Sequence, residues 1–411
     1  MASIILKPKK DAPVRRFHPW IFSGAIQKIK GDPADGDMVE VFSHDDEFLA
    51  TGHFQQGASI AVRIFAFEKI SDPGAFWLKK IAAAKSYRQA LGLPNPTETN
   101  CYRLIHAEGD GLPSLIIDVY GKTAVMQCHS IGMHRDKTLI VNALVEVFGE
   151  NLEAVFDKSK ETLPGKYAAT IQNGCLFGTS SPQVVHENGH AFFVDWEAGQ
   201  KTGFFLDQRD NRQLLTKYVS GKSVLNGFCY SGGFSIYALN AGARLVHSVD
   251  ASQKAIDWTE RNVKLAVEKR QLVVASGQLE GDHEVSSELG EHESFAADVL
   301  KFLKECPAYE VMVIDPPAFA KSLEKRHNAV QGYKRLNIAA LQKVAPGGVL
   351  FTFSCSQVID RELFYNTVVA AAIEAGRQVK VMHHLSQPAD HPVSLFHPEG
   401  AYLKGLCLFV E

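Results

Sequence analysis

The stretch that most constrains the fold runs from residue 223 to residue 250 and reads SVLNGFCYSGGFSIYALNAGARLVHSVD. An apolar strand is followed by a glycine turn, a helix and a second strand that ends in Asp250. Gly232 and Gly233 allow a turn that brings the backbone close to a ligand. An acid about 20 residues beyond such a turn typically accepts hydrogen bonds from a ribose. The stretch therefore predicts a βαβ unit that binds a nucleoside.

The turn also narrows the choice of ligand. The dinucleotide fingerprint is G-x-G-x-x-G, whereas the loop from Gly227 reads GFCYSGG and lacks the third small residue. A pyrophosphate needs the close cradle of backbone amides that this fingerprint builds, and a cofactor without phosphates does not. We therefore expect S-adenosylmethionine. For this stretch taken alone, a βαβ turn without any ligand is the alternative.

The totals set the broad class of the protein. A chain of 411 residues is too long for one core, so two or three domains are expected. The net charge of −3 means that any nucleic acid would be bound by local basic patches. Neither a signal-peptide core nor an apolar run of membrane-spanning length is present, and the seven widely spaced cysteines form no C-x-x-C pair. We expect a cytoplasmic protein with no metal site.

The first 30 residues are strongly basic, with seven lysines and arginines against one acid, Asp11. Arg15 and Arg16 lead directly into the aromatic sequence Phe-His-Pro-Trp, which ends at Trp20. Cations for phosphates beside aromatic rings for bases are what a binder of single-stranded RNA needs. We expect Lys9, Arg15, Arg16 and Trp20 to contact RNA. A solvated charged face with Trp20 in the core is the alternative.

The middle of the chain predicts a small α+β unit without a catalytic group. Its expected elements are a helix over 75–91, a hairpin over 103–121, a strand over 124–128, a helix over 134–149 and a strand over 154–157. Glu108 and Asp110 stand beside glycines and are interpreted as turn residues.

Two later strands deliver reactive groups to one edge of the predicted sheet. The strand from Val311 ends at Asp315, where two prolines prevent the ladder from continuing. The strand from Gly348 ends in Ser-Cys-Ser, which places Cys355 at the carboxyl end, the functional edge of such a sheet. An isolated cysteine of this kind is more often inert core. Residues Cys128, Cys175, Cys306 and Cys407 are expected to be structural.

Together these motifs resemble a known family, the bacterial S-adenosylmethionine-dependent large-subunit rRNA cytosine methyltransferases with an N-terminal PUA domain. The resemblance runs end to end and is carried by Arg16–Trp20, Asn226–Phe234, Asp315–Phe319, Gly332–Asn337, Ser354–Ser356, Ala389–Val393 and Pro398–Gly405. It implies an α/β fold in three parts. These are a PUA β-barrel (1–70), an α+β connector (71–182) and a Rossmann-like class I methyltransferase domain (183–411) whose sheet has seven strands, the last antiparallel.

The resemblance and the residue types together give the expected site. For the cofactor these are Phe204, Gln208, Arg209, Asn226, Phe228, Tyr230, Ser231, Gly232, Asp250, Ser252, Asp298 and Asp315. Tyr333, Lys334 and Lys404 are expected to add to the RNA surface. The chain departs from its family at Ala318, often lysine or threonine in relatives, and in a long acidic stretch (271–294) interpreted as a solvated insertion.

The implied reaction is formation of 5-methylcytosine in 23S rRNA. Carbon 5 of cytosine is a poor nucleophile, and addition of the Cys355 thiolate to carbon 6 would activate it. Asp315 would stabilise protonation at N3. The base that removes the carbon-5 proton, the target nucleotide and a homodimer stay open. Methylation of an exocyclic amine, which would make Cys355 dispensable, methylation of uracil carbon 5, and RNA binding without catalysis are the alternatives.

Overall fold

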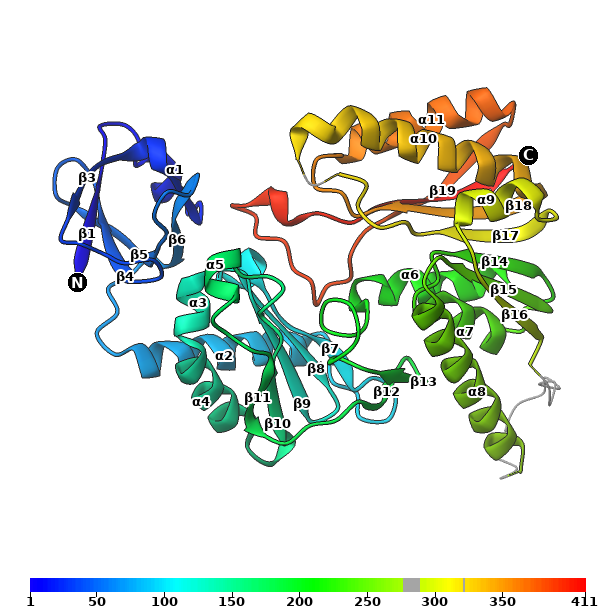
Figure 1. Ribbon diagram of the computed structural model, residues 1–411, viewed down its shortest axis with the longest axis horizontal. Coiled ribbons are helices and arrows are strands. Elements are labelled where there is room, and N and C mark those ends of the chain that lie inside the picture. The colour runs from blue at the N-terminus through cyan, green and yellow to red at the C-terminus, as the bar shows by residue number, and fades with distance from the viewer. Residues whose placement is uncertain (276–288, 321) are drawn as a thin grey trace. The chain divides into compact units, whose positions relative to one another are not determined.

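The computed structural model describes residues 1–275, 289–320 and 322–411, which form two units (Figure 1). Unit 1 comprises Met1–Val185, Val194–Leu206 and Ala389–Gly400, and unit 2 comprises His186–Phe193, Asp207–Pro388 and Ala401–Glu411. Among the described helices, none has both the length and the apolar character that a membrane crossing requires.

The first sheet of unit 1 has six strands in the order β2-β6-β5-β4-β1-β3. Its strands are β1 (Ala2–Leu6), β2 (Trp20–Phe22), β3 (Ile26–Lys30), β4 (Met38–Phe42), β5 (Phe48–Phe54) and β6 (Ile60–Ala66), with a short helix α1 (Ala12–Arg15) between the first two. Inward residues alternate along the strands, as Val39 and Val41 do on β4, and pack with Ile4, Leu6 and Val62. The predicted β-rich unit is confirmed.

The second sheet of unit 1 has five strands in the order β11-β10-β9-β8-β7. The strands are β7 (Cys101–His106), β8 (Leu115–Tyr120), β9 (Thr123–Cys128), β10 (Ala154–Asp157) and β11 (Gly174–Gly178), and the helices are α2 (Pro73–Ala90), α3 (Ile131–Arg135), α4 (Lys137–Phe148) and α5 (Gly165–Ala168). Only β9 and β10 pair in parallel. The predicted hairpin is confirmed, while the helix expected over 134–149 is interrupted at Asp136.

The acids in the hairpin turn do more than shape the turn. Asp110 accepts a hydrogen bond from the His106 amide, as a turn residue would, but it also forms an ion pair with the fully buried Arg88. Glu108 accepts a hydrogen bond of 2.9 Å from Trp20 Nε1. The interpretation of Glu108 and Asp110 as turn residues is confirmed by the turn Ala107–Asp110, and both acids also bind partners from distant parts of the chain.

Unit 2 is built on a seven-stranded sheet in the order β16-β15-β14-β17-β18-β20-β19. Its strands are β14 (Ser223–Gly227), β15 (Leu245–Asp250), β16 (Glu291–Ala296), β17 (Tyr309–Ile314), β18 (Val344–Ser354), β19 (Val379–Leu385) and β20 (Lys404–Val410). The first five pair in parallel, and β20 is antiparallel to both of its neighbours. This is the predicted arrangement, with the last strand reversed. A two-stranded pair, β12 (Gln183–Glu187) and β13 (His190–Val194), precedes the sheet along the chain.

Helices cover both faces of this sheet, so its central strands are apolar on both sides. On β17, Met312 and Ile314 join one hydrophobic cluster, whereas Val311 and Val313 join the other. The helices of unit 2 are α6 (Arg209–Leu215), α7 (Gly233–Asn240), α8 (Gln253–Ala275), α9 (Val299–Glu305), α10 (Arg326–Lys343) and α11 (Arg361–Ala375) (Figure 1). Residues of α10 and α11 pack in the first cluster, and residues of α7 pack in the second.

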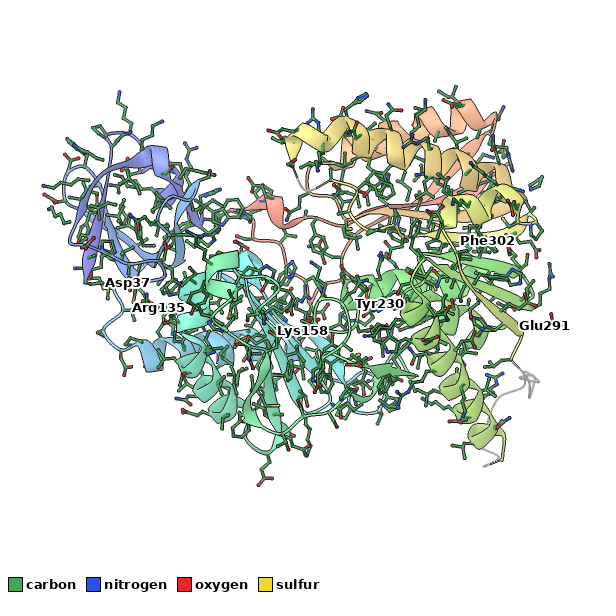
Figure 2. All side chains as sticks on the ribbon, in the orientation of Figure 1. Asp37, Arg135, Lys158, Tyr230, Glu291 and Phe302 are labelled. Carbon is green, nitrogen blue, oxygen red and sulfur yellow. The ribbon has the colours of Figure 1, made fainter. Side chains whose placement is uncertain are left out.

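The acidic stretch 271–294 was predicted to be a solvated insertion, and this was wrong at both of its ends. Residues 271–275 continue α8, and residues from Glu291 form β16, which pairs in parallel with β15. Glu291 and Glu293 lie at alternate positions of this edge strand and are exposed (Figure 2 labels Glu291). Because its exposed positions carry acids, the strand has an acidic sequence. Residues 276–288 lie outside the described part of the chain.

Candidate active site

The predicted glycine turn joins β14 to α7 in an unusual backbone conformation. Phe228, Tyr230 and Gly232 have φ angles of 62°, 49° and 79°. A Cβ on Gly232 would lie 2.9 Å from Thr259 Cγ2 of α8, so glycine is required by packing as well as by φ. Thr259 Oγ1 also donates to the Tyr230 carbonyl over 2.9 Å. The loop is therefore held in a fixed shape by α8.

Asp250 closes the other side of this loop at the end of β15. Its Oδ2 accepts a hydrogen bond from the Tyr230 amide (3.1 Å), and its Oδ1 accepts one from the Ser252 amide (2.9 Å). Each carboxylate oxygen keeps capacity for a further bond, which is what two ribose hydroxyls need. Ser252 directly precedes α8, and its Oγ accepts a hydrogen bond from the Ala255 amide over 3.4 Å.

Two buried polar atoms near the loop also suit a ligand. Asn226 Oδ1 and Ser231 Oγ have no hydrogen-bond partner among the described residues, although both side chains are buried. The Asn226 amide nitrogen is occupied, since it donates to Ser235 Oγ over 2.9 Å. Unsatisfied polar atoms beside a backbone-anchored carboxylate fit a nucleoside cofactor such as S-adenosylmethionine.

The remaining predicted cofactor residues differ in their surroundings. Asp298 is exposed and caps α9, with Oδ1 accepting from the Lys301 amide (2.9 Å). Gln208 Nε2 donates to Asp315 Oδ2 over 3.0 Å, and Arg209 opens α6 with a buried side chain. Phe204 is buried in unit 1, whereas the others lie in unit 2.

Three neighbouring strands bring reactive side chains to one edge of the seven-stranded sheet. The parallel pair of β17 and β18 aligns Ile314 with Thr352, so the strands end beside each other at Asp315 and Cys355. The antiparallel β20 begins at the same edge, because its register pairs Lys404 with Ser354. The Cys355 Sγ lies 3.9 Å from the carbonyl oxygen of Pro316, the residue after Asp315. An acid, a thiol and an amine thus share this edge.

Their ionisation is coupled. Withdrawal from water, and then the charge of Asp207, raises the pKa of Asp315 to about 7. Burial, and then the negative charges of Asp315 and Asp207, raises the pKa of the Cys355 thiol to about 12, an effect that Lys404 opposes. Burial lowers the pKa of Lys404 to about 8. The site therefore favours a protonated thiol, and neutralisation of Asp315 would weaken this preference without removing the effect of burial.

Asp207 belongs with Asp315, Cys355 and Lys404, although it is not among the residues predicted for the site. It accepts a hydrogen bond of 2.6 Å from the Tyr402 hydroxyl, and its charge acts on both Asp315 and Cys355. The only signal for it in the sequence is its position next to Gln208 in a stretch crowded with polar residues.

The residues expected to contact RNA fall into two groups. Lys9, Arg15 and Arg16 are exposed on unit 1, although Arg15 is paired with both Asp11 and Glu47. Trp20 is half-buried there. In unit 2, Lys334 is paired with Glu374 over 2.6 Å. Tyr333 and Lys404 are only 1% and 3% exposed, and their contact with RNA stays a prediction.

Three exposed phenylalanine rings lie together on unit 1, and the sequence analysis did not predict this cluster. The ring of Phe17 contacts those of Phe67 (5.1 Å between centroids) and Phe396 (5.2 Å), and all three are at least 40% exposed. They line a cavity of about 430 Å³ together with Lys80 and Glu108. Phe17 belongs to the basic aromatic motif, but no sequence signal connects it with Phe396.

Cys175, expected to be structural, is also exposed.

Comparison with known proteins matches two parts of the chain to family models. Residues 4–67 match the model of a PUA-like domain, and residues 178–400 match that of an S-adenosylmethionine-dependent methyltransferase. The ribosomal RNA large subunit methyltransferase I of Vibrio parahaemolyticus is 40% identical over 98% of both chains, and that of Aeromonas hydrophila is 38% identical over 98% of both. A solved Streptococcus mutans protein, assigned as a SAM-dependent methyltransferase, superposes over the whole of both chains with a TM-score of 0.80 at 20% identity.

The seven-stranded sheet with its reversed last strand, the glycine turn and the carboxylate after β15 define a class I S-adenosylmethionine-dependent methyltransferase. The predicted fold class, enzyme class and cofactor are confirmed. Within that class, the chain belongs to the ribosomal RNA large subunit methyltransferase I family.

Proposed function

We propose that this protein methylates carbon 5 of a cytosine in 23S rRNA through a covalent bond between Cys355 and the base. The observation that carries the proposal is the convergence of Asp315, Cys355 and Lys404 at the ends of three neighbouring strands. A methyltransferase acting on an exocyclic amine needs no thiol, whereas carbon-5 chemistry does. The family of the chain supports a substrate in the RNA of the large ribosomal subunit.

The reaction begins at carbon 6 of a base turned out of its stack. The Cys355 thiol first loses its proton to solvent, and the thiolate sulfur then forms a bond to carbon 6. The carbon 5–carbon 6 π pair moves to carbon 5, while N3 takes a proton from neutral Asp315. Bound S-adenosylmethionine would supply an electrophilic methyl group, which carbon 5 accepts with this electron pair. Removal of the carbon-5 proton by a base then restores the double bond and expels the Cys355 thiolate, and N3 returns its proton to the Asp315 carboxylate.

The raised pKa of Asp315 suits this role. A carboxyl with a pKa of about 7 is a substantial fraction protonated at neutral pH and has a proton for N3. Its neutral form also removes the largest negative charge that opposes a thiolate at Cys355. Gln208, which donates to Asp315 Oδ2, holds the carboxyl in place.

Lys404 is the cation that would stabilise the thiolate. It is buried, its Nζ donates to the Ser356 carbonyl over 2.7 Å, and its charge lowers the pKa of Cys355. A lysine acting through Cys355 is a positioning residue rather than one that touches the base.

The cofactor would bind beside the glycine turn and Asp250. We propose that Asp250 accepts hydrogen bonds from the ribose and that Asn226 and Ser231 use their unsatisfied oxygens. Phe204, Gln208, Arg209, Phe228, Tyr230, Gly232, Ser252, Asp298 and Asp315 stay proposed members of the same site.

We propose that the N-terminal barrel captures the RNA. Its exposed cations would bind phosphates, and the Phe17, Phe67 and Phe396 rings would accept unpaired bases. The domains we propose are a barrel (1–70), a connector (71–182) and a catalytic domain (183–411).

Trapping of the covalent intermediate tests the function. RNA that carries 5-fluorocytosine at the target should form an adduct with the wild-type protein that survives a denaturing gel, because fluorine cannot leave as a cation. Cys355→Ala should bind S-adenosylmethionine normally, form no adduct and transfer no methyl group. Cys229→Ala is the matched control and should still trap, since Cys229 is buried in the cofactor loop against Thr259. Near-normal turnover by Cys355→Ala, with methyl groups on an exocyclic amine, would contradict the proposal.

A further inference from the structure

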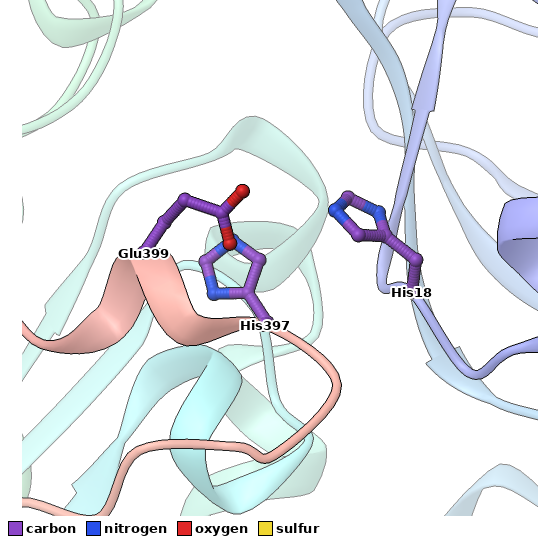
Figure 3. Close-up of side chains that lie close together, drawn as sticks. All are labelled: His18, His397 and Glu399. Atoms are coloured by element: carbon purple, nitrogen blue, oxygen red, sulfur yellow. The ribbon is translucent and has the colours of Figure 1, made fainter.

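We propose that His18, His397 and Glu399 form a binding site for a divalent transition metal, with zinc as the preferred ion. One ligand atom from each side chain lies within 4.8 Å of the other two (Figure 3). All three residues belong to unit 1. The site is separate from the proposed methyl transfer, and it differs from the sequence expectation of no metal.

His397 provides the strongest indication of a missing ligand. Its side chain is 3% exposed, and neither ring nitrogen has a hydrogen-bond partner among the described residues. The Glu399 Oε2 lies 3.8 Å from His397 Nε2, too far for a hydrogen bond. A buried polar atom without a partner is destabilising, and a metal bound to Nε2 would satisfy one of these two nitrogens.

One tautomer of His18 has the outer contact of a metal ligand. Its Nδ1 accepts a hydrogen bond of 3.2 Å from the Trp20 amide when it carries no proton, and it lies 3.3 Å from the Trp20 carbonyl oxygen. When Nδ1 carries the proton and donates to this carbonyl, the lone pair of Nε2 is available, and that nitrogen faces Glu399 in Figure 3. A histidine that binds a metal commonly donates its other ring N–H to a backbone carbonyl in this way.

The donor set indicates the metal. Two imidazole nitrogens and one carboxylate oxygen are ligands that zinc accepts, with a water completing the tetrahedron. Metal–ligand bonds of about 2.0–2.1 Å bring tetrahedral ligand atoms to about 3.4 Å from each other. The 3.8 Å pair must therefore close by less than about 1 Å, which the 58% exposed Glu399 can supply.

The ligands come from opposite ends of the chain. His18 precedes β2 of the barrel, and His397 and Glu399 lie in the segment Ala389–Gly400. The Trp20 ring lies 4.3 Å from that of His397 and 6.0 Å from that of His18, and its Nε1 donates to Glu108. Zinc would thus join the barrel to this segment.

Isothermal titration calorimetry of metal-free full-length protein with Zn²⁺ tests the proposal. Four proteins are compared: wild type, His18→Ala, Glu399→Gln, and His44→Ala, a control histidine on the exposed barrel surface. All four proteins, including the one called wild type here, carry Cys175→Ser, because the exposed Cys175 would bind zinc independently. Wild type and the control should bind one equivalent. His18→Ala and Glu399→Gln should bind zinc at least about 10- to 100-fold more weakly. Removal of a residue that only hydrogen-bonds to a ligand already causes a loss of this size, and these two variants remove a ligand itself.

Cobalt(II) provides a second measurement on the same proteins. Four-coordinate cobalt absorbs in the visible, and this absorption should appear with wild type and disappear with Glu399→Gln, a change of an exposed side chain that leaves the fold intact. Equal zinc affinity in all four proteins, or the same cobalt spectrum with and without Glu399, would overturn the site.

Discussion

Lys404 on β20 lies directly opposite Ser354 on β18, so its amine is placed beside the neighbouring Cys355. The positive charge of Lys404 lowers the pKa of the Cys355 thiol, and burial keeps water from screening the interaction. This relationship predicts that Lys404 governs the reactivity of Cys355 without contacting the base.

Replacement of Lys404 by Met should raise the pKa of Cys355 and reduce methyl transfer, most strongly below about pH 8, where the wild-type amine is charged. Alkylation of Cys355 by iodoacetamide, followed as a function of pH by peptide mass spectrometry, reports the thiolate directly and should shift to higher pH. Lys404→Arg keeps a cation and should recover part of the reactivity. An unchanged alkylation profile in Lys404→Met would assign the lysine a purely structural role.

Asp315→Asn should remove the proton donor and lower kcat by about 10²–10⁴-fold, the usual contribution of general acid–base catalysis. Asparagine can still accept the hydrogen bond from Gln208, so the loop should keep its shape. The calorimetric affinity for S-adenosylmethionine should fall by less than about tenfold, as expected when a neutral hydrogen bond replaces a charged one. A variant with wild-type kcat would exclude Asp315 as the acid.

The same substitution has a predictable effect on stability. The pKa of Asp315 rises from 3.8 to about 7 on folding, so the folded state holds the proton more tightly than the unfolded state. This group therefore destabilises the wild type increasingly as pH rises from about 4 to about 7, and not below. At 1.36 kcal/mol per pKa unit, Asp315→Asn should gain on the order of 2–4 kcal/mol at pH 8 and almost nothing at pH 3.5. Urea unfolding at the two pH values measures the difference, and an advantage independent of pH would contradict it.

Much of the methyltransferase sheet could be predicted because its signals are local. The glycine turn, Asp250 and the apolar strand before Asp315 each lie within a few residues, and the structure places them as expected. The burial of Lys404 could not be predicted, because it depends on the register of β20 against β18, which no local pattern encodes. The His18–His397 pair joins opposite ends of the chain, so spacing rules for metal ligands could not find it.

Asp250→Ala should weaken S-adenosylmethionine binding by about 1.5–3 kcal/mol, the scale of a lost hydrogen bond to a charged group. The loss includes the two amides of Tyr230 and Ser252 that Asp250 anchors. Calorimetry should show the weakening, with Asp257→Ala, an exposed acid on α8, as the control. Equal affinity in the two variants would remove Asp250 from the cofactor site.

RNA capture by the barrel separates into a charge contribution and a stacking contribution. Replacement of Arg15 and Arg16 by Gln should lower RNA affinity and flatten its dependence on salt, since phosphate contacts release counterions. Most of the effect should come from Arg16, because Arg15 is paired with Asp11 and Glu47. Lys380→Gln, which removes an exposed lysine paired with Glu411 on unit 2, is the control for the loss of one positive charge, to be compared with Arg16→Gln alone.

Phe17→Ala and Phe396→Ala should lower affinity by about 1–3 kcal/mol for each base that loses its stacking partner, while the salt slope stays unchanged. Fluorescence anisotropy with a short single-stranded RNA at several salt concentrations measures both quantities for every variant. S-adenosylmethionine affinity should stay constant throughout, because neither change touches the proposed cofactor residues. A salt slope that does not move with the arginines would show that they are a solvated face. An affinity that ignores both phenylalanines would remove the aromatic group from the RNA surface.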